Sequence, residues 1–92
     1  MELLQFAVPE SLGAICAEAV TRIAGGATLL GGGWGWWVNG DGEIERERVN
    51  WLIVGVDKEK ADSVIGVVKE ILRNGGESAI FYVREKPTLE WL

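Results

Sequence analysis

The chain has 92 residues, 48% of them hydrophobic, a formal net charge of −5 and no histidine. This length supports one domain with a single core, and the acidic balance disfavours nucleic acid as a partner, because the phosphate backbone carries the same charge. The lack of histidine removes the commonest metal ligand and general base, so we expect one domain over residues 1–92 without catalytic residues, a metal site or a cofactor.

The N-terminal segment predicts a cytoplasmic chain that begins with a strand. It has no basic region and no apolar run long enough for a signal peptide or a membrane span, so we expect no membrane partner. The single cysteine, Cys16, has no partner for an internal disulfide, which favours a reducing compartment. Residues 3–8 are apolar at odd and even positions, as is typical of a central strand, and we expect this strand to end at Pro9.

Two segments have the apolar spacing of amphipathic helices, at about residues 10–24 and at residues 58–74. Ser11 is the candidate N-cap of the first helix and Asp57 that of the second, and a Gly-Gly pair follows each helix. Cys16 lies in the apolar stripe of the first helix, so we expect a buried and unreactive thiol.

A long hairpin lies between the helices, with arms at residues 27–38 and 43–56 and a turn at residues 39–42, Asn-Gly-Asp-Gly. A last strand at residues 78–84 completes the order β-α-β-β-α-β. This order predicts an α+β, ferredoxin-like split β-α-β-β-α-β sandwich, in which an antiparallel sheet carries both helices on one face. The hairpin arms are about twice as long as the outer strands, so roughly half of the hairpin must overhang the sheet.

The second arm of the hairpin predicts self-association, because residues 49–56 are apolar at odd and even positions. Two helices cover only one face of such a sheet, so the other face needs a second subunit. That face carries either the row at positions 49, 51 and 53 or the row at positions 52, 54 and 56. The tail EKPTLEWL is also too apolar to remain in water. The predicted oligomer interface consists of Val49, Trp51, Ile53, Trp91 and Leu92.

The hairpin and the tail resemble a known family. The hairpin residues Gly42, Glu43, Ile44, Glu45, Glu47, Val49, Leu52 and Ile53 are similar to the W-x-G-x-I-x(n)-E-x-x-L-x-I hairpin of the CutA-type divalent-cation-tolerance proteins. Residues 89–92, Leu-Glu-Trp-Leu, are similar to the terminal Y-L-[DE]-W-[IL] of that family. The resemblance implies a trimer, as in the related PII signalling proteins, with sheets facing inward and hairpins clasping neighbouring subunits. The A-C-V-N and H-x-Y-x-x-P-E motifs of the family, and the G-R-x-G-x-G-K phosphate loop of PII proteins, have no counterpart here.

A turn that pairs Val38 with Glu43 places the alternate glycines of the first arm on one face with two arginines, and two tryptophans on the other face with Glu45 and Glu47. Arginine forks over a glycine floor, with tryptophans nearby for stacking, fit a small anionic or nucleotide-like ligand. The predicted ligand-binding residues are Gly33, Trp34, Gly35, Trp36, Trp37, Arg46 and Arg48. The alternative is that the glycines admit a neighbour's aromatic side chains while the arginines pair with its glutamates.

These features favour a non-enzymatic homo-oligomer, with a trimer preferred, that senses or sequesters an anionic or nucleotide-like ligand between subunits. One alternative is a structural or protein-interaction module that uses the Trp-rich hairpin and the C-terminal tail. Another is a divalent-metal-binding CutA-like protein, although consecutive glutamates on one strand face suit surface charge better than chelation. In a third alternative, an enzyme, Glu45, Glu47 and Tyr82 would act as acids or bases.

Overall fold

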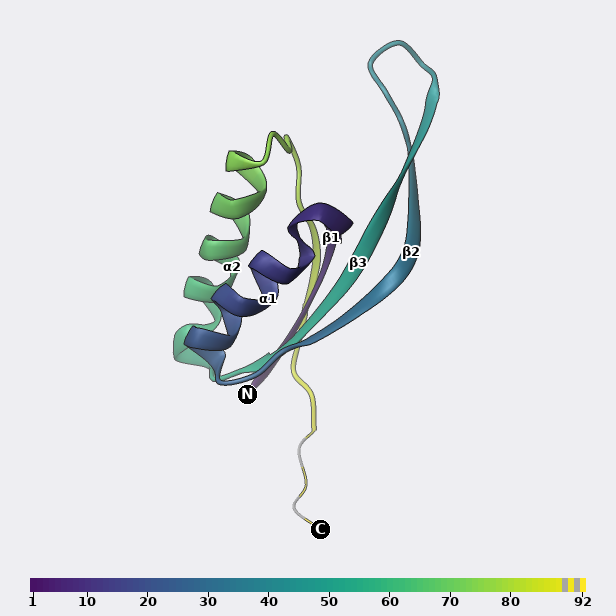
Figure 1. The fold of residues 1–92 in the computed structure, drawn as a ribbon. Helices are drawn as coiled ribbons and strands as arrows, with labels where there is room; N and C mark the ends of the chain where they lie inside the picture. Colours follow the sequence, from purple (N-terminus) through teal and green to yellow (C-terminus); the bar gives the residue numbers. More distant parts are fainter. Residues whose placement is uncertain (89, 91) are drawn as a thin grey trace.

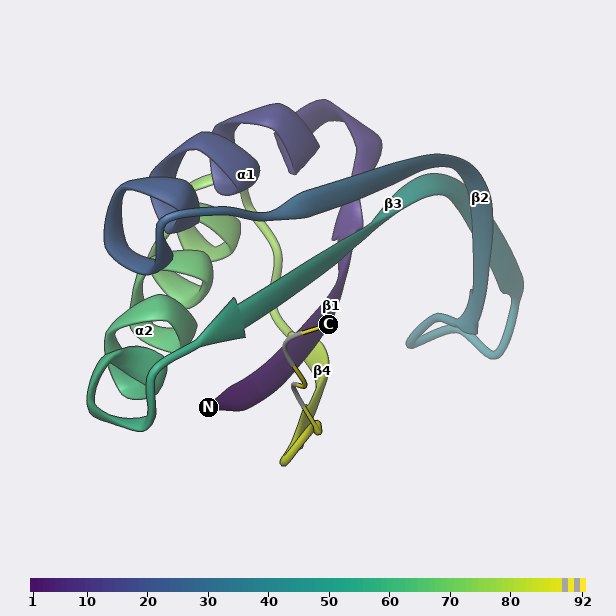
Figure 2. The ribbon, with the colours of Figure 1, turned by 90° about the horizontal axis from the view of Figure 1, so that it is seen from below.

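The predicted ferredoxin-like order of elements is confirmed. The computed structural model describes residues 1–88, 90 and 92. The elements are β1 (Glu2–Pro9), α1 (Glu10–Ala24), β2 (Thr28–Val38), β3 (Ile44–Val56), α2 (Lys58–Asn74) and β4 (Phe81–Glu85). The strands form one antiparallel sheet in the order β2-β3-β1-β4. Both helices lie on the same face of this sheet (Figures 1 and 2). None of the described helices is long and apolar enough to cross a membrane.

Two of the predicted boundaries are wrong, the N-cap of α1 and the start of β4. The N-cap of α1 is Pro9 rather than Ser11, and no side chain caps the helix. The fixed φ of proline suits a helix start, and its missing N–H is one that the first turn would leave unpaired. β4 begins at Phe81, three residues after the predicted start, and its pairing with β1 ends at Ala7 opposite Phe81. The ladder cannot continue far beyond this pair, because Pro9 has no N–H to donate.

The helix-covered face of the sheet contains the core. Alternate residues of β1 and β3 point toward the helices and are almost fully buried, as are the helix residues that meet them. The core residues of the two strands are Leu4, Phe6, Val8, Leu52, Val54 and Val56. Cys16 packs in this core, so the prediction that it is buried is confirmed. Burial also raises the pKa of its thiol. The row at positions 49, 51 and 53 therefore lies on the opposite face.

The hairpin overhangs the sheet as predicted. β1 pairs with β3 only between Val49 and Val56, so residues 44–48 of β3 have β2 as their only neighbouring strand among the described residues. We call residues 34–48 the ribbon, and Figure 1 shows that it rises past the ends of both helices. A bulge between Leu30 and Gly33, with φ of 79° at Gly32, bends β2 where the ribbon begins.

The predicted pairing of Val38 with Glu43 is wrong, because Val38 pairs with Ile44. The loop has five residues instead of four. The Asn39 backbone N–H donates to the Glu43 carbonyl at 2.8 Å, and Gly42 takes the positive φ that closes the loop. Below the bulge the predicted register returns, with Leu30 opposite Trp51. The one-residue slip therefore runs from the pair Gly33–Val49 to the tip of the hairpin, and there it moves the side chains of one arm to the opposite face relative to the other arm.

Candidate functional site

The slipped register places the two ribbon arginines beside tryptophans rather than above glycines. Trp34 is opposite Arg48, and Trp36 is opposite Arg46. The guanidinium carbon of Arg46 lies 4.8 Å from the centroid of the Trp34 ring, and that of Arg48 lies 5.1 Å away. Both distances fit cation–π contacts. The prediction that the arginines share a face with Gly33 is therefore wrong, and Trp34, Trp36, Arg46 and Arg48 form one group that we call the Trp-Arg cluster.

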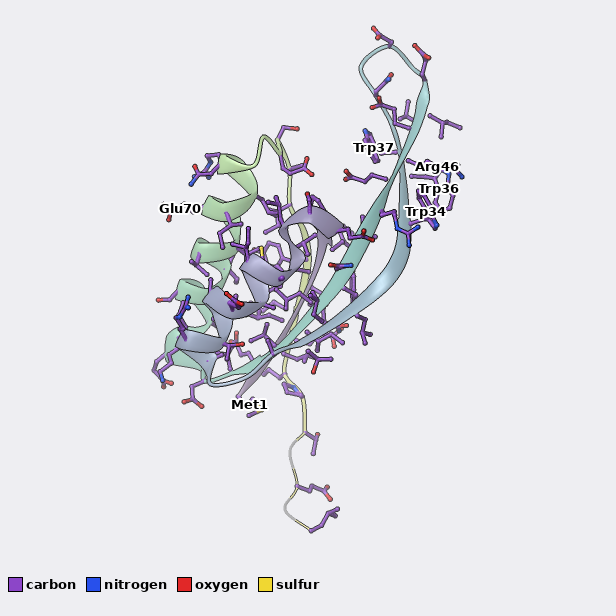
Figure 3. All side chains as sticks on the ribbon, in the orientation of Figure 1. Met1, Trp34, Trp36, Trp37, Arg46 and Glu70 are labelled. Carbon is purple, nitrogen blue, oxygen red and sulfur yellow. The ribbon has the colours of Figure 1, made fainter. Side chains whose placement is uncertain are left out.

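The two arginines of the Trp-Arg cluster differ in their partners. Arg48 donates from Nε to Oε2 of Glu10 at 2.9 Å, which ties the ribbon to the first turn of α1. Arg46 forms no salt bridge within residues 1–88, 90 and 92. Trp36 beside it is 61% exposed, and Figure 3 shows Trp34, Trp36 and Arg46 on the side of the ribbon that points away from the body of the molecule. Arg46 can therefore meet an anion that comes from outside the chain.

The predicted glycine floor is occupied by a side chain of the same chain. A Cβ at Gly33 would lie 3.1 Å from the Val49 carbonyl oxygen, and a Cβ at Gly35 would lie 3.2 Å from Val49 Cγ1. The glycines make room for Val49, and they are not a bare surface for a ligand. The alternative considered from the sequence, that these glycines admit a neighbour's aromatic side chains, stays a prediction, and the side chain that lies against them in one chain is Val49 of β3.

The opposite side of the ribbon borders a cleft that the sequence did not predict. This inner cleft has a volume of about 480 Å³ and lies between the ribbon, the end of β1 and the segment 77–81. Figure 3 shows that Trp37 lies on the side of the ribbon facing the body, opposite the Trp-Arg cluster. The main lining residues are Trp37, Glu47, Val49, Glu77, Ile80 and Phe81.

Glu47 is half-buried in the wall of the inner cleft, and its pKa is raised. Burial is the largest cause, and the charges of Glu77 and Glu45 add to it. The fold therefore disfavours ionised Glu47 relative to the unfolded chain. The resulting loss of stability is present above the folded-state pKa and disappears as the pH falls below the ordinary pKa of a glutamate.

We expect the Glu47→Gln variant to have a higher free energy of unfolding than the wild type at neutral pH. The difference should shrink toward zero as the pH falls below the carboxyl range, because both side chains are then uncharged. Urea unfolding followed over that pH range measures it. Glu43→Gln, in the exposed loop at the ribbon tip, is the matched control and should leave the pH profile unchanged. A wild-type advantage at neutral pH would contradict the assignment.

The open face of the sheet carries most of the predicted interface. Val49, Trp51 and Ile53 point to this side and are half-buried, while Leu30 and Phe81 are 52% and 66% exposed. Trp51 Nε1 donates to Gln5 Oε1 at 2.9 Å, so the indole lies across the β1–β3 pair. No helix in the described part of the chain covers this face (Figure 2).

The tail residues of the predicted interface are only partly defined. Leu92 is fully exposed. Trp91 lies outside the described residues. Within residues 1–88, 90 and 92, no three His, Cys, Asp or Glu side chains are grouped closely enough to hold a metal ion.

The sheet, its helix-covered face and the overhanging ribbon define the chain as a ferredoxin-like protein with an extended β2–β3 hairpin. No family model and no curated protein matches the sequence, but solved structures match its fold. CutA from Xylella fastidiosa matches with a TM-score of 0.76 at 14% identity, and the match covers 98% of this chain and 86% of the CutA chain. The divalent cation tolerance protein Cut A1 from Thermus thermophilus matches with a TM-score of 0.76 at 20% identity, and the match covers 100% of this chain and 88% of the Cut A1 chain.

The fold is that of the CutA proteins. A third match, described as the PII-like protein CutA from Nostoc sp. PCC 7120, has a TM-score of 0.68 at 16% identity, with 95% of this chain and 81% of that chain covered. The resemblance first seen in the hairpin and the tail is therefore confirmed in three dimensions over almost the whole chain.

Proposed function

We propose that this chain forms a CutA-type homo-oligomer, with a trimer preferred, which acts in divalent-cation tolerance as a binding protein rather than an enzyme. The observation that supports it is the apolar open face of the sheet, on a fold shared with proteins described as divalent cation tolerance proteins. A monomer would leave Leu30 and Trp51 in contact with water, whereas an assembly buries them.

The distribution of acidic groups suggests where a cation would bind. Divalent cations take oxygen ligands from several groups at once, and no such group of three is present within the described part of one chain. A cation bound by this protein would therefore take ligands from more than one copy. Cation binding and assembly then depend on each other.

Growth of a bacterial strain that lacks its own CutA protein tests this function. The wild-type chain should restore growth at raised copper or zinc concentrations, whereas a variant that cannot assemble should not. Failure of an expressed, assembled wild-type chain to restore growth would contradict the role in cation tolerance without contradicting the assembly.

A second candidate function is the binding of an anionic or nucleotide-like ligand between subunits. The observation that favours it is the Trp-Arg cluster, in which exposed indoles lie beside Arg46, a guanidinium without a carboxylate partner in the described residues. Indoles can stack on a flat ring, and a guanidinium can bind phosphate with two hydrogen bonds. Gly33, Gly35 and Trp37 lie on the other side of the ribbon, so the proposed ligand site is reduced to the cluster itself.

We expect Arg46→Ala to weaken binding of AMP to the assembled protein by about tenfold, because it removes a charged hydrogen-bond donor. Arg73→Ala, at the exposed end of α2, is the matched control and should bind AMP as the wild type does. Isothermal titration calorimetry of the three proteins measures the difference. Equal affinities for Arg46→Ala and the wild type would remove this candidate.

A further inference from the structure

The inner cleft has the size and shape of a small-molecule site. Its volume of about 480 Å³ falls in the range of known ligand pockets. One wall is the ribbon, which contributes Trp37 and Glu47, and the opposite wall is the segment 77–81 with the end of β1. All of these residues belong to one chain, but Val49 and Phe81 also lie on the open face of the sheet, so the inference requires that the assembled protein leave the cleft open.

The charges that line the inner cleft are all negative. Among the described residues, Glu47 and Glu77 are its only charged lining residues, and no lysine or arginine lines it. They are close enough for the charge of Glu77 to raise the pKa of Glu47. Lys69 and Arg73 line a smaller neighbouring cavity of about 180 Å³ that shares Glu77, but neither forms a salt bridge with it in the described part of the chain. An anion would be repelled here, and a cation attracted.

The remaining walls of the cleft select the kind of cation. Trp37 and Phe81 contribute large exposed aromatic side chains, and the residues between them and the sheet are mostly apolar, among them Val49 and Ile80. A metal site built from protein usually gathers three or more side-chain ligands, and the described lining of this cleft offers only the carboxylates of Glu47 and Glu77. An ammonium group with an apolar body, in contrast, can meet a carboxylate and an indole face while burying its hydrocarbon part.

We propose that the inner cleft binds an organic cation, a protonated or quaternary amine with an apolar group, whose charge lies between Glu47 and the Trp37 ring. Glu47 supplies the opposite charge, Trp37 a cation–π contact, and Val49, Ile80 and Phe81 cover the hydrocarbon. A positive ligand would offset the repulsion between Glu47 and Glu77, which contributes to the raised pKa of Glu47.

Phenethylamine tests the proposal, with phenethyl alcohol as the neutral analogue and 3-phenylpropionate as the anionic analogue of similar size. Titration of the wild-type protein, followed by the indole N–H signals in ¹H–¹⁵N NMR spectra, should show that the amine shifts the Trp37 signal. We expect the amine to bind about fivefold more tightly than the alcohol, as one partly exposed charge pair contributes up to about 1 kcal/mol. The anion should not bind.

Variants separate the parts of the cleft. Glu47→Gln, an isosteric change, should weaken phenethylamine binding by about fivefold, and Glu43→Gln should not change it. Trp37→Leu should weaken binding by about threefold through loss of the cation–π contact, whereas Trp36→Leu, its neighbour on the other side of the ribbon, should have no effect. The proposal would be overturned by equal binding of amine and alcohol, by full affinity of Glu47→Gln, or by no binding to the wild type, as when another copy fills the cleft.

Discussion

The Ile53→Glu variant should be a folded monomer under conditions in which the wild type is an oligomer. Ile53 lies near the centre of the open face, opposite Gln5 of β1 and Thr28 of β2. In an oligomer that buries this face, the new carboxylate would be desolvated without a partner, at a cost of about 3 kcal/mol per interface. This cost raises the concentration needed for assembly by roughly a hundredfold. Size-exclusion chromatography with light scattering measures the mass of the variant.

Ile15→Glu is the matched control for this experiment. Ile15 is also an exposed isoleucine, 54% accessible, but it lies on α1 and away from the open face. If the open face joins the copies, this variant assembles as the wild type does. Assembly of Ile53→Glu, or loss of assembly in both variants, would show that another surface joins the copies.

The Gly13→Ala variant should lose about 1–3 kcal/mol of unfolding free energy, although alanine favours helices over glycine. Gly13 is buried where α1 crosses β3, and a Cβ there would lie 2.1 Å from Oδ1 and 3.0 Å from Cγ of the buried Asn50. The amide must move, or the helix must lift from the sheet. Urea unfolding of the variant measures the loss.

Two further variants test the cause of this loss. Gly66→Ala, in α2, has no atom within 4 Å of the added Cβ and should gain about 0.5–1 kcal/mol. In the double variant Gly13→Ala with Asn50→Ala, the space freed at Asn50 should restore part of the loss. Equal stability changes for Gly13→Ala and Gly66→Ala would mean that the close approach of α1 to β3 does not limit the residue at position 13.

The sequence was sufficient to predict the order of elements and the uncovered face of the sheet. Both are determined by spacing: period 3.6 in residues 10–24 and 58–74, and apolar residues on both sides of residues 49–56. The choice between the two apolar rows required the structure, because Leu52 and Ile53 are equally apolar. The pairing of Leu52 with Phe6 and its burial under the helices identify the row that faces the core.

The ribbon could not be predicted in detail, because one residue in the turn decides which side chains share a face. A hairpin loop at residues 39–42 and one at 39–43 have the same glycines and the same Asn39. The difference lies in hydrogen bonds of Asn39, whose side chain accepts from the Asp41 and Glu43 backbone N–H groups. This slip moved Arg46 and Arg48 from the glycines to the tryptophans.

The inner cleft escaped prediction for a different reason. Its residues come from four separate segments, β1, the β2–β3 hairpin, α2 and residues 77–81, and no local pattern marks them as neighbours. Only the curl of the ribbon toward the body brings Trp37 and Glu47 near Glu77 (Figure 2). The glutamates at positions 43, 45 and 47 looked like surface charge, and one of them, Glu47, proves to be half-buried.

Sedimentation equilibrium of the wild-type chain at micromolar concentration tests most directly whether copies of the chain cover the open face. We expect a species three times the 10.0 kDa mass of one chain, with a protected Trp51 indole N–H in hydrogen exchange. A well-folded species of 10.0 kDa that persists as the concentration is raised would contradict it.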